Sequence, residues 1–200
     1  MKRLSVISNS FPSFIGSWNI EKNSLCTDII NFYEDHPELH KKGQSTMGLD
    51  ESIKKTTDLP VLPNDLIKPE YKVIKDYISE LYECHNDYME IWPFLKANIS
   101  KLDIGSFQIQ KYNPGDHFQK IHSERTTISN SHRVLAWMTY LNDVHDGGNT
   151  FFENYDLKIK PEQGKTLIWP AEWTHAHSGE ILKSGVKYII TGWMNFPYTR

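Results

Sequence analysis

The sequence has few cysteines, no long apolar run and no excess of positive charge. Its two cysteines, Cys26 and Cys84, lie far apart in sequence, which argues against a disulfide framework or a zinc knuckle. No stretch of about 20 apolar residues could span a bilayer, and the N-terminal residues lack the apolar run of a signal peptide. These absences lead us to expect a cytoplasmic protein that does not cross a membrane.

Charge and length narrow the class further. The formal net charge is −3, so the basic surface that typifies nucleic-acid-binding proteins is not expected. The 200 residues, of which 38% are hydrophobic, suffice for one domain with a sizeable core. We therefore expect a single domain over residues 1–200, helical over about 1–100 and β-rich over about 101–196. The sequence does not determine the oligomeric state.

Two segments of the first half have helical periodicity. Apolar residues recur at steps of three and four over 23–35 and, more strongly, over 69–92, where Pro69 suits the first position of a helix. The stripe of the second helix should cover one face of a sheet. Between them, residues 41–67 are polar and rich in glycine and proline, and we interpret them as a long irregular connection, a lid or a surface wrap.

From Gly105 onward the period changes to two. Phe107 and Ile109 alternate with Gln108 and Gln110, so one face of this strand is polar, as expected if it lines a cavity that holds a polar ligand. Further strands are expected at residues 134–141, 150–152, 166–169 and 186–193. Short strands with turn signals, preceded by helices, predict an α+β, β-rich fold: a jelly roll (a cupin-like double-stranded β-helix) with the N-terminal helices packed on one sheet.

His122-Ser123-Glu124 is the main candidate for chemistry. Side chains two residues apart on a strand point to the same side, and two histidines with one carboxylate form the facial ligand set of non-haem Fe(II) oxygenases. A third ligand is needed from a distant strand. Of the nine histidines, His175 and His177 stand between two expected strands, and spacing alone leaves both open.

At this point the sequence resembles a known family, the Fe(II)/2-oxoglutarate-dependent dioxygenases of the prolyl 4-hydroxylase type. The resemblance covers roughly residues 105–195. It is carried by Tyr112-Asn113-Pro114-Gly115, His122-x-Glu124, Arg133, Tyr140-Leu141-Asn142-Asp143, Gly147-Gly148-Asn149-Thr150-x-Phe152, His177-x-Gly179, Gly185-x-Lys187-Tyr188 and Thr191-x-Trp193.

The family pattern chooses between the two histidines. In relatives the distal histidine is followed by glycine two and eight residues on and by a basic residue ten residues on. His177 meets all three conditions and His175 meets none. The resemblance therefore implies that His122, Glu124 and His177 are the catalytic metal ligands and that His175 is a neighbour or a pocket wall. Glu124 departs from the family, in which aspartate is usual at this position.

The resemblance also implies cofactors and binding residues. Fe(II), 2-oxoglutarate and O2 would be used, with ascorbate as a candidate reductant, and a substrate would be hydroxylated while succinate and CO2 are released. Lys187 would pair with the distal carboxylate of 2-oxoglutarate. Tyr112, Tyr140 and Thr191 match further co-substrate positions. Arg133 matches a substrate-facing position, and Trp173 and Trp193 have indoles suited to packing on a substrate.

The substrate is the least determined part of the prediction. The resemblance favours a prolyl or other residue in a peptide or protein, and a small molecule or a nucleobase is the alternative, because a fold does not name its substrate. Two other classes remain: a zinc hydrolase, which also uses two histidines and a glutamate, and an inactive jelly-roll binding module. Residues 113–121, and less directly 44–67, are expected to border the substrate groove and to tighten on binding.

Overall fold

Two antiparallel sheets dominate the computed structural model, which describes residues 12–45, 48–99 and 101–197. The larger sheet has eight strands. Its main path runs in the order β1 (Gly16–Asn19), β10 (Lys165–Pro170), β7 (Arg133–Tyr140), β12 (Lys187–Asn195), β5 (Phe107–Tyr112), β3 (Thr57–Val61) and β2 (Lys41–Lys42), while β4 (Asp103–Ile104) pairs with β12. Residues 1–11, where the sequence predicts no signal peptide, lie outside the described residues.

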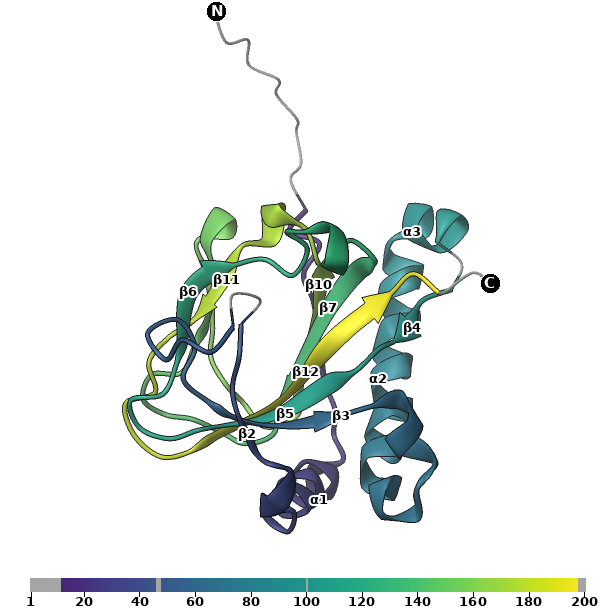
Figure 1. The fold of residues 1–200 in the computed structure, drawn as a ribbon. Helices are drawn as coiled ribbons and strands as arrows, with labels where there is room; N and C mark the ends of the chain where they lie inside the picture. Colours follow the sequence, from purple (N-terminus) through teal and green to yellow (C-terminus); the bar gives the residue numbers. More distant parts are fainter. Residues whose placement is uncertain (1–11, 46–47, 100, 198–200) are drawn as a thin grey trace, which may run out of the picture.

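The smaller sheet has four strands and faces the larger one (Figure 1). Its order is β6 (Phe118–His122), β11 (His177–Gly179), β8 (Thr150–Phe152) and β9 (Leu157–Ile159). β6 is therefore an edge strand, on the side where β2 and β3 end the larger sheet. These strands are short. Apart from the neighbouring β8 and β9, they come from distant segments of the chain, so most of their pairing is long-range.

The helices cover the outer face of the larger sheet, as predicted (Figure 1). They are α1 (Asn23–Glu34), α2 (Lys72–Ile91) and α3 (Pro93–Asn98). α2 buries the stripe that contains Ile74, Ile78 and Leu81. A buried polar contact fixes it further, since the hydroxyls of Tyr77 and Thr139 on β7 lie 2.8 Å apart. Among the described residues, no helix is both long and apolar enough to span a bilayer.

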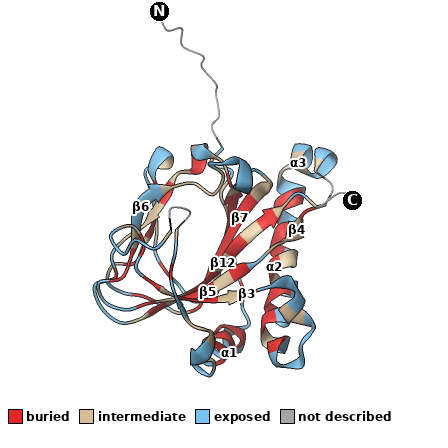
Figure 2. Cartoon of the chain, in the orientation of Figure 1, coloured by how far each residue is buried: buried red, intermediate tan, exposed pale blue. Residues whose placement is uncertain are grey.

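Two apolar clusters lie on opposite faces of β5 and β12. Phe107 and Ile109 pack outward with the helices, whereas Tyr112 and Ile189 face the space between the sheets. The predicted period of two is therefore confirmed, and Gln108 and Gln110 lie on the inner face. Figure 2 shows the buried residues that run along β7, β12 and the face of α2 that meets the sheet.

The prediction for residues 41–67 is wrong in part. The segment contains β3, which pairs with β5 from Thr57↔Lys111 to Val61↔Phe107. Pro60 argued against a strand in the sequence, because proline has no N–H to donate to a neighbouring strand within a sheet. It is tolerated here because β2 pairs only with Thr57 and Asp58, which leaves Pro60 on an open edge. β1 and β3 thus add strands to the half of the chain that was expected to be helical.

Candidate metal and co-substrate site

The structure brings His122, Glu124 and His177 together between the two sheets. His122 ends β6 and His177 begins β11, and the two residues are directly opposed in the antiparallel pairing. One candidate ligand atom from each of the three side chains can be chosen so that all lie within 4.8 Å of one another. Glu124 Oε1 lies 3.3 Å from His177 Nε2 and 3.8 Å from His122 Nε2. All three donor atoms therefore point toward one small volume.

Backbone contacts fix how the two imidazoles present their nitrogens. The Nδ1 of His122 lies 2.8 Å from the Lys120 carbonyl oxygen, and the Nδ1 of His177 lies 2.9 Å from that of His175. A carbonyl only accepts, so each Nδ1 carries the proton and donates it. This leaves the lone pair on each Nε2 free for a metal.

Hydrogen bonds from Trp193 and Arg133 fix the position of Glu124. Its Oε2 accepts a 2.7 Å hydrogen bond from the indole Nε1 of Trp193, and its main-chain oxygen accepts one from Arg133 at 3.0 Å. The Arg133 guanidinium also lies 3.5 Å above the Trp193 ring, a cation–π contact. Oε2 is thereby occupied, and Oε1 remains the oxygen that faces the histidines.

The protonation states of His122 and Glu124 suit metal binding. Burial, with the neighbouring His177, lowers the pKa of His122 to about 4, although Glu124 opposes the shift. Burial alone would raise the pKa of Glu124, but the adjacent His177 and His122 and the hydrogen bond from the Trp193 indole outweigh it and lower that pKa to about 2. At neutral pH the site therefore offers a neutral imidazole and a carboxylate. This donor set fits Fe(II).

A buried lysine lies in the same interior. Lys187 is 3% exposed; its Nζ donates to the Gly148 carbonyl at 3.0 Å and lies 4.0 Å from the centre of the Tyr112 ring. Burial lowers its pKa to about 7, with Glu180 opposing. In the described part of the chain, no carboxylate forms an ion pair with it. An ammonium with spare donors and no anionic partner is costly inside a protein, so this place fits an anionic ligand such as 2-oxoglutarate.

The other predicted co-substrate residues line the inner face around Lys187. Tyr112 stands directly opposite Lys187 in the sheet, and Tyr140 opposite Ile189. Burial raises the pKa of both phenols, so both stay protonated. Each donates its proton within the protein, Tyr112 to Gln110 Oε1 at 2.8 Å and Tyr140 to Thr150 Oγ1 at 2.6 Å. The Thr191 hydroxyl donates to the Trp137 carbonyl at 2.8 Å, which leaves it only as an acceptor toward a ligand.

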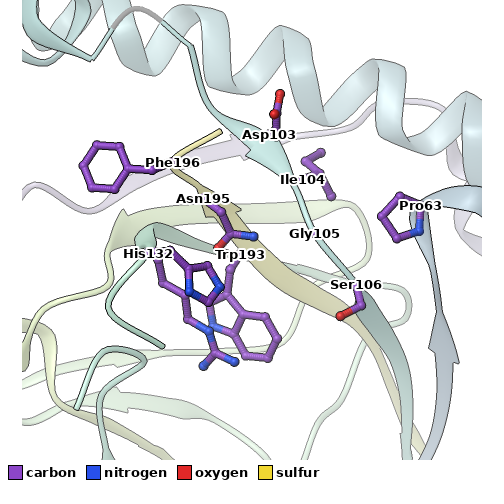
Figure 3. A pocket seen from close by; sticks show the side chains of 10 residues that line it. Pro63, Asp103, Ile104, Gly105, Ser106, His132, Trp193, Asn195 and Phe196 are labelled. Atoms are coloured by element: carbon purple, nitrogen blue, oxygen red, sulfur yellow. The ribbon is translucent and has the colours of Figure 1, made fainter. Parts of the chain in front are cut away.

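The predicted substrate residues fall in different places. Arg133 and Trp193 line a cavity of about 350 Å³. The metal ligands are not among its lining residues, but Arg133 and Trp193 both contact Glu124. Figure 3 shows this cavity, with Pro63 on one side and His132 and Trp193 on another. Trp173 is not among its lining residues and is 71% exposed. The structure does not bring Trp173 together with the other two.

The side chain of His175 is turned away from the metal ligands. Its Nε2 lies 2.7 Å from the Ser13 carbonyl oxygen and 3.2 Å from the Tyr155 hydroxyl, so it ties the N-terminal segment to the barrel. Its carbonyl orients His177.

Sequence patterns gave no signal for two other neighbours of the ligands. Trp169, whose buried indole Nε1 has no partner among the described residues, packs edge-on against His177. Phe118 stacks on His122.

Comparisons with known proteins agree with this geometry. Residues 107–195 match the family model of the 2OG-Fe(II) oxygenase superfamily. A probable prolyl 4-hydroxylase 9 of Arabidopsis thaliana is 28% identical over 119 residues, which cover 48% of this chain and 39% of the relative. A putative prolyl 4-hydroxylase of Acanthamoeba polyphaga mimivirus is 25% identical over 103 residues, covering 43% of each. The chain thus spans about two fifths of the length of these relatives.

The fold is shared more widely than the sequence. A viral collagen prolyl hydroxylase of Paramecium bursaria Chlorella virus-1, solved with 2OG, superposes with a TM-score of 0.69 at 19% identity and covers 92% of this chain and 96% of that one. A Trichoplax adhaerens prolyl hydroxylase, solved with a hypoxia inducible factor peptide, gives 0.71 at 14% identity, covering 92% and 84%. The predicted double-stranded β-helix is confirmed.

Proposed function

We propose that this chain, whose residues 107–195 match the family model of the 2OG-Fe(II) oxygenase superfamily, is an oxygenase of the prolyl 4-hydroxylase type that hydroxylates a prolyl or other residue in a peptide or protein. One observation supports the proposal most: a His–Glu–His cluster that could hold a metal lies in the same protein as a buried lysine on the inner face of the larger sheet, and this lysine has no carboxylate partner in the described part of the chain. A zinc hydrolase would have no use for that lysine.

Each part of the mechanism can be assigned to residues of this chain. His122, Glu124 and His177 would hold Fe(II), which with 2-oxoglutarate and O2 supplies the oxidising power for inserting oxygen into a C–H bond, with release of succinate and CO2. Lys187 would bind the distal carboxylate of 2-oxoglutarate by a charge-assisted hydrogen bond. The buried Tyr112 and Tyr140 would line the co-substrate site and exclude water, and ascorbate would serve as reductant.

A substrate enters beside the Arg133–Trp193 pair in this proposal. Both apolar and polar residues line this cavity, which suits a peptide with its apolar side chains and polar backbone groups. The two cysteines, Cys26 and Cys84, are free and buried thiols, in keeping with a reducing, cytoplasmic location.

A peptide library tests the substrate class. The protein would be incubated with Fe(II), 2-oxoglutarate and ascorbate, and peptides that gain one oxygen atom would be sought by mass spectrometry, with the Glu124→Ala variant as the matched control. We expect wild-type-dependent oxygen gain on proline or a neighbouring residue. Succinate release with no modified peptide, and oxygen gain in a small molecule or a nucleobase instead, would contradict the peptide assignment.

The binding of 2-oxoglutarate should weaken as the pH rises above about 7. The lysine pKa is lowered in the free protein, so above that pH Lys187 is neutral, and binding a carboxylate must first protonate it. The dissociation constant, measured calorimetrically with Mn(II) in place of iron, should therefore rise by up to about tenfold per pH unit. Lys187→Arg should flatten the profile, because a guanidinium stays charged. A wild-type profile that is flat from pH 6 to 9 would remove Lys187 from the binding site.

The two segments expected to border the groove are joined in the structure. Lys55 and His117 exchange main-chain hydrogen bonds of 2.8 and 3.0 Å, and Gln119 Nε2 donates to the Ser52 carbonyl at 3.1 Å. We therefore expect hydrogen-exchange protection to increase together at residues 50–56 and 113–121 when 2-oxoglutarate and a substrate peptide bind. Unchanged protection at 113–121 would show that this border is static.

A further inference from the structure

A buried ion pair lies outside the segment that matches the family model. Lys54 Nζ is 2.6 Å from Asp58 Oδ2, and the two side chains are 3% and 4% exposed. Thr56 donates to the other carboxylate oxygen of Asp58 at 2.7 Å. Removing two charges from water costs several kcal/mol per ion, and an apolar pair often serves stability as well. The pair is therefore poorly explained by stability alone.

One arm of the pair leads to the co-substrate site. The Nε2 of Gln110 donates to Gln108 Oε1 at 2.9 Å and to Asp58 Oδ2 at 3.4 Å, and its Oε1 accepts a 2.8 Å hydrogen bond from the Tyr112 hydroxyl. The Tyr112 ring in turn lies under the Lys187 ammonium. Asp58 and Gln108 together orient the amide of Gln110, because an Nε2 that faces these two acceptors leaves Oε1 facing the phenol. The rotamer of Tyr112 is thereby coupled to the ion pair.

The other arm leads to a metal ligand. Lys54 Nζ lies 5.6 Å from the centre of the Phe118 ring. Phe118 stacks on the His122 imidazole with ring centres 3.8 Å apart and planes 13° from parallel. The orientation of the His122 imidazole is thus fixed by a backbone hydrogen bond at Nδ1 and by stacking on the Phe118 ring, which Lys54 contacts in turn.

The pair sits at the seam between the two sheets. Lys54 comes from the segment between β2 and β3, and its neighbour Lys55 bridges to His117 just before β6 (Figure 1). Gly43 packs directly over the pair, where a Cβ would lie 3.0 Å from Lys54 Cε and 3.2 Å from Asp58 Oδ2. The pair therefore lies in the segment that connects β3 of the larger sheet with the residues just before β6.

We propose that Lys54 and Asp58 are positioning residues that set the Tyr112 hydroxyl through Gln110 and the His122 ring through Phe118. The inference rests on the proposed function, since it assigns to Tyr112 and His122 the roles given above. It places part of the active-site support in the segment 43–58, upstream of the matched domain.

A double variant tests the proposal without leaving a single buried charge. Lys54→Met/Asp58→Asn keeps the shape of both side chains and removes both charges. The matched control is Lys72→Met/Asp76→Asn, the same change in an exposed pair with the same spacing on α2. We expect the buried double variant to fold and to bind Co(II) and 2-oxoglutarate about tenfold more weakly, by absorption spectroscopy and calorimetry. The control should match wild type.

Variants of the two arms separate positioning from general structural support. Gln110→Leu should weaken 2-oxoglutarate binding and leave the Co(II) affinity unchanged, whereas Phe118→Leu should alter the Co(II) spectrum and affinity first. Wild-type affinities in a folded Lys54→Met/Asp58→Asn variant, or equal losses of both ligands in the two arm variants, would overturn the inference. A wild-type protein that binds no 2-oxoglutarate would instead overturn the proposed function, and the inference with it.

Discussion

Replacement of His122, Glu124 or His177 by alanine is expected to abolish 2-oxoglutarate turnover, by at least about a thousandfold. The three donor atoms converge on one point, and two remaining ligands would not hold Fe(II) in an ordered geometry. The fold should survive in each variant, because the ligands line a cavity rather than fill a core. Succinate formation and the thermal unfolding midpoint would be measured side by side.

His175→Ala is the matched control for this series. Its ring is buried two residues from His177 but binds the Ser13 carbonyl and the Tyr155 hydroxyl. The main-chain oxygen that orients His177 would remain. We expect a less stable protein that retains a substantial part of its turnover. An inactive His175→Ala variant beside an active His177→Ala variant would show that the ligand assignment is wrong.

Lys187→Met should raise the KM for 2-oxoglutarate by roughly 30- to 1000-fold while leaving iron binding nearly unchanged. The loss corresponds to about 2–4 kcal/mol, because the distal carboxylate would be buried without its cationic partner. Methionine retains the length of the lysine stem, so the cavity should keep its shape. An unchanged KM would remove Lys187 from the co-substrate site.

The same variant should be more stable than wild type when no ligand is bound. Burial lowers the lysine pKa from 10.5 to about 7, which corresponds to roughly 5 kcal/mol as an upper limit. Between these pH values the unfolded chain binds the proton and the folded chain does not, so wild-type stability rises with pH from about 7 to about 10.5. Chemical denaturation at pH 7 and pH 9.5 should show this rise in wild type and its absence in Lys187→Met.

Local patterns predicted the parts of this site that depend on local geometry. The period of two in 107–112 placed Tyr112 on the inner face. The choice of His177 over His175 came instead from the family resemblance, whose pattern Gly179, Gly185 and Lys187 match. The structure then set His177 opposite His122. The place of Tyr112 follows from strand geometry, which a short stretch of sequence is enough to predict.

The contacts that support the metal ligands depend on tertiary packing, so no local sequence pattern predicted them. Lys54 and Asp58 stand in a polar, proline-bearing stretch and become buried only because β3 joins the sheet and the segment before it bridges to His117. Trp193 was expected as a substrate wall, yet its indole nitrogen binds Glu124. The contacts that a side chain makes across the barrel depend on how the two sheets pack against each other, and a local sequence pattern does not contain this information.

Succinate release tests the central claim most directly. The protein would be given 2-oxoglutarate, O2, ascorbate and the peptide library, with either Fe(II) or Zn(II), beside the Glu124→Ala variant. The account predicts succinate from wild type with Fe(II), and none with Zn(II) or from Glu124→Ala. Peptide hydrolysis supported by Zn(II), or no succinate from a folded protein that binds both Fe(II) and 2-oxoglutarate, would contradict it.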